Sequence, residues 1–210
     1  MNITDKLNIT NEDNMALMAR YPDNYFDLAI VDPPYGIEIM TAGGTPKHLG
    51  FKQYEKKNWD NAIPNENYFK ELFRVSKNQI IWGANYFTQY LPSSMGWILW
   101  DKGQRISQSD GELAFSSFQK ALRVFTLNRC AIKMEGAIHP TQKPVALYKW
   151  LLEKYAKEGD KILDTHLGSG SIAIACHDYG FDLTACELDK EYYDKAIERI
   201  KNHVNQQKLF

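Results

Sequence analysis

Short apolar runs alternate with amphipathic stretches along most of this chain. Short apolar runs such as 26–31 are typical of strands buried on both faces of a sheet. Apolar residues spaced three and four apart, as in 144–157, predict helices. Further strands are expected at 6–10, 79–82, 97–100, 161–164 and 182–187, with an antiparallel pair at 113–118 and 123–127, and further helices at 14–20, 67–77, 171–179 and 190–204. This alternation predicts an α/β fold: an open, mostly parallel sheet with helices on both faces and an antiparallel edge strand.

Length and composition indicate one globular unit. With 210 residues, 44% of them hydrophobic, the chain is expected to form a single domain over 1–210. Residues 36–64 are rich in Gly, Lys and Asn and are expected to form a long inserted loop, and loops of that length usually have a function. The chain shows no signal-peptide pattern, no apolar run long enough to cross a bilayer, and three cysteines without a CxxC pair. We therefore expect a cytoplasmic protein with no membrane partner.

The net charge of −1 conceals two basic stretches. Residues 41–57 hold four lysines and one glutamate, a local charge of +3, and residues 102–133 hold six basic and two acidic residues, a local charge of +4. A basic face on a near-neutral protein is typical of contact with nucleic-acid phosphates, although scattered solvated lysines would give the same counts. The candidate DNA-binding residues are Lys47, Lys52, Lys56, Lys57, Arg105, Arg123 and Arg129.

A glycine-rich turn follows the expected strand 161–164. Glycines at 168 and 170 permit a tight turn that brings a ligand close to N–H groups at the start of helix 171–179. Glu187 ends the next strand, where a carboxylate can accept both hydroxyls of a ribose. The unit predicts a site for a nucleoside-bearing cofactor, although a plain tight turn would use the same glycines. Because only one strand and one helix follow, the remaining strands must come from the N-terminal part, and the sheet is predicted to be circularly permuted.

Three motifs carry a resemblance to a known family. The corner "DPPY" (32–35), then "HPTQKP" (139–144) and then the glycine loop occur in the order typical of the beta subclass of amino-group DNA methyltransferases. "YPDNYFDLAIVDPPYG" (21–36), "GANYF" (83–87) and "WILWDKG" (97–103) also resemble stretches of these proteins, so the resemblance covers nearly the whole chain. A DPPY sequence arises by chance in roughly one of a thousand chains of about 200 residues. The order of independent motifs makes the resemblance specific.

The resemblance implies an activity and a set of site residues. It implies a circularly permuted Rossmann-like methyltransferase fold and methyl transfer from S-adenosyl-L-methionine to the N6 amine of adenine in double-stranded DNA after base flipping. It assigns catalysis to Asp32, Pro33, Pro34 and Tyr35, and predicts no metal site. The implied cofactor-binding residues are Asp13, Asp32, His139, Thr141, Gln142, Lys143, Asp164, His166, Gly168, Ser169, Gly170 and Glu187.

The proposed chemistry explains the corner. An exocyclic amine is a poor nucleophile because its lone pair is delocalised into the ring, and acceptors around it favour the developing positive charge. The Asp32 carboxylate could accept one N–H, and the carbonyl of Pro33, held by a rigid backbone, could accept the other. Tyr35 could stack on the base, which must leave the duplex to be reached. A structural proline turn with a packed tyrosine is the alternative interpretation.

The chain departs from the family pattern in two places. Thr165 and His166 stand where family members often have Pro and Phe, so His166 is expected to pack near the cofactor in a different way. The expected target-recognition region, about 104–138, is short. Because one short domain offers little surface for recognition, we expect a homodimer. A cognate restriction enzyme is not indicated by the sequence.

Other functions remain open at this stage. The acid in DPPY favours adenine N6, while a cytosine-N4 DNA or RNA methyltransferase is the alternative within the family. A dinucleotide-binding Rossmann protein would explain the glycine loop but neither of the other motifs. An inactive DNA-binding module could keep every motif, and only a transfer assay distinguishes it.

Overall fold

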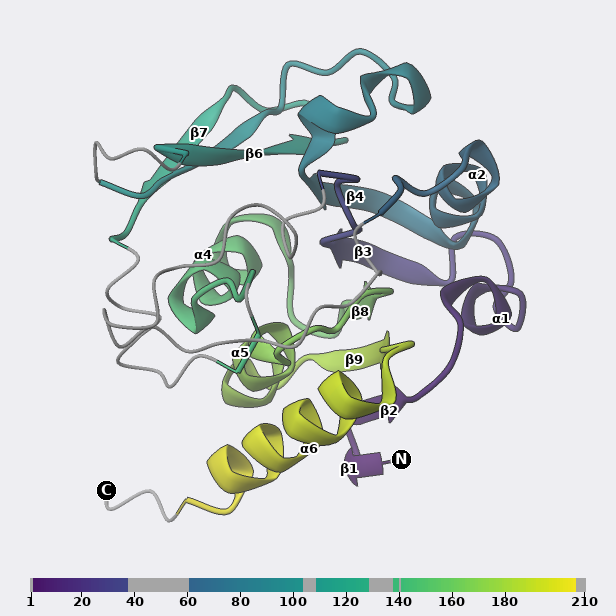
Figure 1. Cartoon of the computed structure of the whole chain (residues 1–210), viewed down its shortest axis with the longest axis vertical. Coiled ribbons are helices and arrows are strands. Elements are labelled where there is room, and N and C mark those ends of the chain that lie inside the picture. The colour runs from purple at the N-terminus through teal and green to yellow at the C-terminus, as the bar shows by residue number, and fades with distance from the viewer. Residues whose placement is uncertain (1, 38–60, 104–108, 129–137, 140, 207–210) are drawn as a thin grey trace.

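The structure is a computed structural model that describes residues 2–37, 61–103, 109–128, 138–139 and 141–206. Among these residues, nine strands form one sheet in the order β1-β2-β9-β8-β3-β4-β6-β5-β7 (Figure 1). The strands are β1 (Asn2–Thr4), β2 (Leu7–Thr10), β3 (Phe26–Val31), β4 (Ser76–Trp82), β5 (Ile98–Asp101), β6 (Gly111–Ser116), β7 (Arg123–Thr126), β8 (Lys161–Asp164) and β9 (Asp182–Cys186). The helices are α1 (Asn14–Met18), α2 (Glu66–Val75), α4 (Val145–Tyr155), α5 (Ser171–Tyr179) and α6 (Lys190–Val204), with short 3-10 turns η2 (Ala84–Tyr86) and η3 (Thr88–Tyr90).

Five neighbouring strands at the centre of the sheet, β2, β9, β8, β3 and β4, run parallel. Numbered from the strand before the glycine loop, their order is 3-2-1-4-5, which is the order of a doubly wound dinucleotide-binding sheet. The chain reaches these strands in a different sequence, since β8 and β9 come last. The predicted circular permutation is therefore confirmed, as are the open, mostly parallel sheet and an antiparallel edge strand, β1.

One predicted pairing is wrong. The strands expected at 113–118 and 123–127 do not pair with each other, because β5 lies between them. Instead β6 runs antiparallel to both β4 and β5, and β7 runs parallel to β5 at the other edge of the sheet. Strand order of this kind depends on hydrogen bonds between segments far apart in sequence, so local patterns do not reveal it. Strand β1, only three residues long, was also not predicted.

Helices cover both faces, as predicted (Figure 1). Helices α4, α5 and α6 pack on one face over apolar residues such as Leu28, Ile30 and Ile162. Helices α1 and α2 pack on the other face over alternate residues such as Ala29 and Val31. Strand β3 is thus buried on both sides, which explains why every residue in it except Asp27 is apolar. In the part of the chain that the structure describes, no helix combines the length and apolar character needed to span a bilayer.

The sheet order places a crevice between β3 and β8. The chain leaves β8 into α5 on one face, and the segment after β3 leads to α2 on the other face. Two connections that diverge at adjacent strand ends leave a gap at the carboxyl edge, where ligands bind in sheets of this type. Both candidate motifs of the sequence, the corner after β3 and the glycine loop after β8, therefore reach the same place.

Candidate active site

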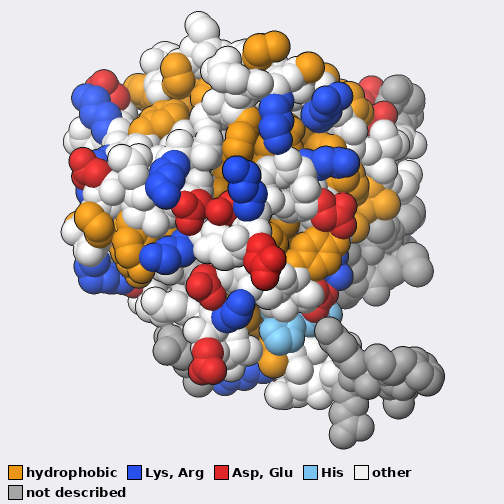
Figure 2. Space-filling view, turned by 180° about the vertical axis from the view of Figure 1, so that it is seen from behind, with side chains coloured by type: hydrophobic (Ala, Val, Ile, Leu, Met, Phe, Trp, Pro, Cys, Tyr) orange, Lys and Arg blue, Asp and Glu red, His pale blue; other side chains and the backbone are white. Residues whose placement is uncertain are grey.

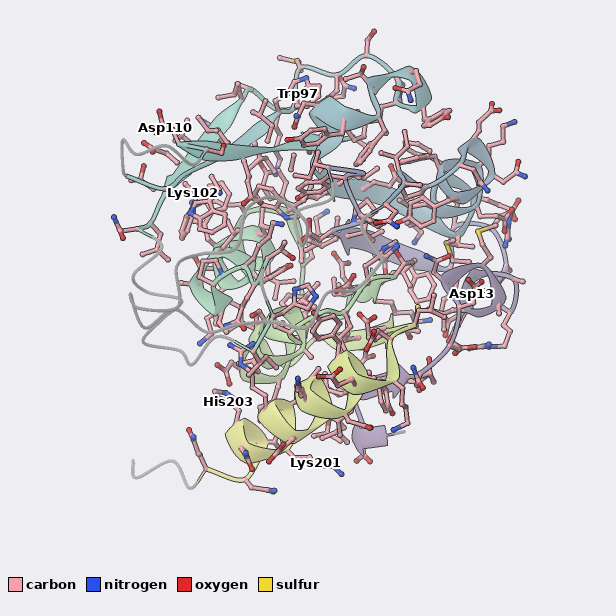
Figure 3. All side chains as sticks on the ribbon, viewed as in Figure 1. Asp13, Trp97, Lys102, Asp110, Lys201 and His203 are labelled. Carbon is pink, nitrogen blue, oxygen red and sulfur yellow. The ribbon has the colours of Figure 1, made fainter. Side chains whose placement is uncertain are left out.

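A cavity of about 500 Å³ lies at this edge of the sheet, within the range of about 300–1,000 Å³ that is usual for small-molecule sites. Most predicted cofactor-binding residues line it: Asp13, Asp32, His139, Thr141, Gln142, Lys143, His166, Gly168, Ser169 and Glu187. Asp13 lies at the start of α1, where its carboxylate caps the helix (Figure 3). Asp164 and Gly170 are buried and do not form part of the lining. Of the predicted catalytic residues, Asp32 and Pro34 line the cavity, whereas Pro33 and Tyr35 do not.

The glycine loop and Glu187 are tied together. Gly168 and Gly170 have φ values of +53° and +75°, a region that strains other residues, and a Cβ at Gly170 would lie 2.8 Å from Ile200 Cδ1. The N–H groups of Gly168 and Asp189 each donate to one oxygen of Glu187 at 2.9 Å. Burial raises the pKa of Glu187, and these two N–H groups counteract it. Each carboxylate oxygen keeps a second lone pair, so the side chain can still accept a hydroxyl from the cavity.

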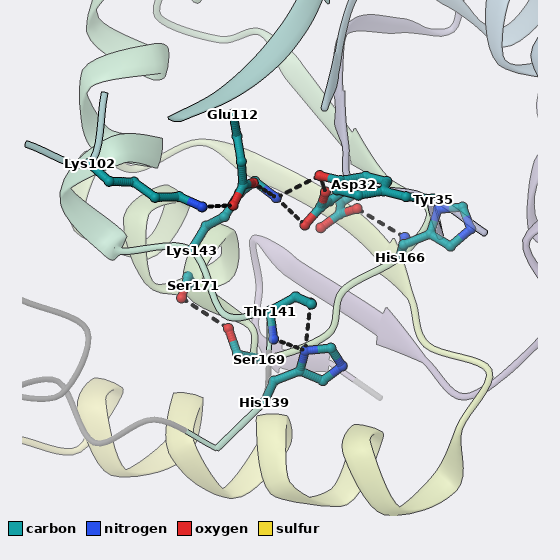
Figure 4. Close-up of polar contacts among 11 residues, drawn as sticks. Asp32, Tyr35, Lys102, Glu112, His139, Thr141, Lys143, His166, Ser169 and Ser171 are labelled. Carbon is teal, nitrogen blue, oxygen red and sulfur yellow. Dashed lines mark hydrogen bonds and ion pairs between the residues drawn. The ribbon is translucent and has the colours of Figure 1, made fainter. Parts of the chain in front are cut away.

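The "HPTQKP" segment supplies an unused donor. Gln142 is 5% exposed, and its Oε1 accepts the N–H of Ile138 at 3.0 Å. Its Nε2 has no hydrogen-bond partner among the described residues. A buried amide N–H without a partner is destabilising by about 1–3 kcal/mol, so the position fits a ligand that brings an acceptor such as a carboxylate. Nearby, Thr141 directs its N–H and hydroxyl at His139 Nδ1, at 3.3 and 3.0 Å (Figure 4).

His166 has a defined hydrogen-bonding role. Its Nε2 lies 3.0 Å from Asn14 Nδ2, and its Nδ1 lies 2.9 Å from Thr165 Oγ1, which in turn contacts the Tyr68 hydroxyl at 2.8 Å. An amide nitrogen only donates, so Nε2 accepts and the ring proton is on Nδ1. Burial lowers the pKa of His166 to about 4, so the ring is neutral near pH 7. The cavity wall thus has a neutral polar ring at this position. Neither Asn14 nor Tyr68 was identified from the sequence.

The corner after β3 holds Asp32 between two partners. The Tyr35 hydroxyl donates to Asp32 Oδ1 at 2.6 Å, and Lys143 Nζ donates to Oδ2 at 2.5 Å (Figure 4). The Tyr35 ring stacks on Tyr86, with centroids 5.2 Å apart and planes inclined by 15°. The Tyr35 ring also packs against the backbone at Gly83, where an added Cβ would lie 2.0 Å from Tyr35 Cε1. The glycine of "GANYF" therefore lets the tyrosine lie against the backbone.

A second carboxylate and a second lysine extend this cluster. Glu112, on β6, lies 3.1 Å from Lys143 Nζ and 2.7 Å from Lys102 Nζ. Lys102 and Asp110 lie close together at the ends of β5 and β6, where the N–H of Lys102 donates to the carbonyl of Asp110 (Figure 3). Burial opposes ionisation of Glu112, but the two lysines outweigh it and hold its pKa at about 2. The sequence analysis gave Glu112 no site role, and Lys102 appeared there only within "WILWDKG" and the basic stretch 102–133.

Most predicted DNA-binding residues lie outside the described residues: Lys47, Lys52, Lys56, Lys57, Arg105 and Arg129. Arg123 is described, and it is exposed on the edge strand β7. On the face in Figure 2, basic side chains stand among acidic and apolar ones. The described part of that face therefore has no concentrated basic patch, and the predicted DNA contacts stay predictions.

The proteins that this chain resembles are DNA methyltransferases. Residues 101–198 match a family model described as DNA methylase. The type II methyltransferase M.HpaI of Haemophilus parainfluenzae is 27% identical over 229 residues, which cover 87% of this chain and 70% of that protein. The structure of the M1.HpyAVI–SAM complex has a TM-score of 0.62 at 19% identity, covering 92% of this chain and 99% of that one. The cytosine-N4-specific PvuII DNA methyltransferase gives 0.63 at 10% identity, covering 96% and 92%. The predicted resemblance and the Rossmann-like methyltransferase fold are confirmed.

Asp164, buried beneath the glycine loop, makes stability depend on pH. Burial raises its pKa to about 8, whereas an unfolded aspartate titrates at about 3.9. Between these values the folded state binds more protons than the unfolded state, so this group makes stability fall as pH rises from about 4 to about 8. Asp164→Asn should flatten that fall. The free energy of unfolding of the variant minus that of the wild type should therefore be larger at pH 9 than at pH 4, by at least about 1.4 kcal/mol.

Urea unfolding of the variant and the wild type across this pH range measures the effect. Asp182→Asn, at an exposed position on the adjacent strand β9, is the matched control and should leave the pH profile as it is. An unchanged slope in Asp164→Asn would show that Asp164 is ionised in the folded protein at neutral pH.

Proposed function

We propose that this chain, which resembles the amino-group DNA methyltransferases, methylates the N6 amine of adenine in double-stranded DNA with S-adenosyl-L-methionine as the methyl donor. The observation that carries the proposal is a juxtaposition within one cavity. Asp32 lines it beside the pair Glu187 and Gly168, which suits a nucleoside. A donor and an acceptor bound in one cavity can react without further diffusion.

The residues present fit the proposed cofactor. Glu187 has lone pairs for a ribose diol, the loop at 168–170 permits close approach, and the unpaired Gln142 Nε2 offers a donor to a carboxylate. When bound, S-adenosylmethionine supplies a methyl group on a positively charged sulfur, which departs as a neutral thioether. The neutral state of His166 suits a positively charged ligand, because it adds no repulsion.

Asp32 has the chemistry that the acceptor amine requires. Its oxygens bind Tyr35 and Lys143 with one lone pair each, so a further lone pair on the carboxylate can accept an N–H of the amine. The interaction strengthens as positive charge develops on nitrogen, so it favours the transition state over the ground state. As the N–C bond forms, the bond from the methyl carbon to sulfur breaks, and the nitrogen then releases its extra proton to water to regain a neutral amine.

The choice of base rests on the corner sequence. An acid at the first position, Asp32, is the usual form in adenine-N6 enzymes, which favours adenine over cytosine. The similar fold of a cytosine-N4-specific enzyme means that cytosine N4 is the alternative product to test. Base flipping is part of the proposal, because the amine of a stacked base does not reach Asp32. We also expect a homodimer, with target recognition by residues of about 104–138, of which 104–108 and 129–137 lie outside the described residues.

The first prediction from this function concerns the cofactor. Glu187→Ala removes a charged acceptor, and a hydrogen bond to a charged group contributes about 1.5–3 kcal/mol. The variant should bind S-adenosylmethionine at least tenfold more weakly by calorimetry. Glu158→Ala, at an exposed position before β8, is the control and should bind normally. An affinity unchanged in Glu187→Ala would remove Glu187 from the cofactor site.

The second prediction concerns the acceptor. Asp32→Ala should remain able to bind cofactor and DNA, but its single-turnover methyl transfer should fall by roughly 10²–10³, as expected for loss of a preorganised electrostatic partner. Asp32→Asn keeps an acceptor oxygen without the charge and should lie between. Retention of more than about a tenth of the wild-type rate by Asp32→Ala, at saturating cofactor, would mean that the corner is not the site of transfer.

A further inference from the structure

Four charged side chains alternate in sign beside the cavity: Asp32, Lys143, Glu112 and Lys102 (Figure 4). They come from the corner after β3, the segment before α4, strand β6 and the residue after β5. Their side chains are 17%, 1%, 24% and 8% exposed, respectively. Removing ions from water is costly unless each is paired, and here every carboxylate contacts an ammonium. The four charges sum to zero, so the cluster is stable only as a set.

Lys143 is the centre of this cluster. An ammonium has three N–H donors, and Lys143 Nζ lies within hydrogen-bond distance of three acceptors: Asp32 Oδ2 at 2.5 Å, Glu112 Oε2 at 3.1 Å and the Tyr35 hydroxyl at 3.2 Å. These contacts use its full donor capacity, which leaves none for a cofactor carboxylate. Lys143 is thus bound to two carboxylates, those of Asp32 and Glu112, at the same time.

We propose that Lys143 and Glu112 are positioning residues for Asp32: Lys143 keeps the carboxylate ionised and oriented, and Glu112 draws Lys143 away from it as the target amine binds. This inference rests on the proposed function, and it gives a role to two groups that the reaction does not otherwise use. The target amine must compete with Lys143 for Asp32. Because Lys143 can bind Glu112 instead, the amine displaces it more easily. Without Glu112, Lys143 would remain on Asp32 and oppose the amine.

The electrostatic surroundings of Asp32 support this division of roles. Three groups act on its pKa: Lys143 before α4, Glu112 of β6 and Tyr35 of the same corner. Asp32 in turn raises the pKa of Tyr148 on α4, Asp164 at the end of β8 and Tyr68 on α2. Burial raises the pKa of Asp32, Lys143 lowers it and Glu112 raises it. The two neighbours therefore act on the pKa of Asp32 in opposite directions.

The opposed directions make the proposal testable. Lys143→Gln should move the acid limb of the single-turnover rate upward by at least one pH unit, because an opposite charge at this distance shifts a carboxylate by about 1–3 units. Glu112→Gln should move the limb downward and lower the plateau rate at least tenfold, because Lys143 then stays on Asp32. The double variant should bring the limb back between those of the single variants. Lys149→Gln, which loses an ion pair with Asp178 on α5, is the control and should move no limb.

Two further measurements separate the possible outcomes. Carboxyl ¹³C NMR titration of Asp32 without DNA should show the same opposite pKa shifts, and calorimetry should show cofactor affinity within threefold of wild type in both single variants. Equal losses of rate at every pH with an unmoved Asp32 titration would overturn the proposal. So would a tenfold loss of cofactor affinity in Lys143→Gln, since Lys143 would then be a cofactor ligand. Opposite NMR shifts in a protein that transfers no methyl group would support the charge coupling and refute the proposed function.

Discussion

Strands β3 and β8 end side by side at the carboxyl edge of the sheet, and their connections turn to opposite faces. The site depends on this geometry because it opens a cavity beside the core: most residues of both strands are buried, while residues just beyond them face the gap. Asp32 directly follows β3, and the glycine loop follows β8 within a few residues. The hydrogen bonds between β3 and β8 therefore fix the separation of Asp32 from the loop. A circular permutation leaves this arrangement unchanged, because it alters the order of strands along the chain and not their order in space.

Charge is distributed unevenly around the cavity. On the glycine-loop side, the buried acids Asp164 and Glu187 both have raised pKa values, mainly through burial, and backbone N–H groups counteract the effect. On the corner side, Lys143 and Lys102 compensate Asp32 and Glu112 with direct ion pairs. The first arrangement suits a site that takes up a cation, and the second suits a carboxylate that must stay ionised while its partners change. The two sides of the cavity thus differ in how their carboxylates are compensated.

The features that depend on short stretches of sequence were predicted correctly. The extent of β3, β8, α5 and α6 followed from apolar periodicity and from glycine and proline boundaries. The order of β5, β6 and β7 did not, because strand pairing depends on distant hydrogen bonds. At the site, motifs identified Asp32, Gln142 and Glu187, whereas Glu112, Asn14 and Tyr68 carry no motif and become neighbours only through folding. Lys143 was found, but the direction of its side chain was not, since nothing in "HPTQKP" indicates a contact with Asp32.

Identification of the methylated nucleoside decides whether the protein transfers a methyl group to adenine N6. Duplex DNA would be incubated with the protein and S-adenosylmethionine that carries a deuterated methyl group, digested to nucleosides, and analysed by mass spectrometry. We expect N6-methyldeoxyadenosine with the deuterated methyl group, and a rate of its formation lower by roughly 10²–10³ in a parallel reaction with Asp32→Ala. Label on N4 of deoxycytidine, or label on no nucleoside while the protein binds both cofactor and DNA, would contradict this expectation.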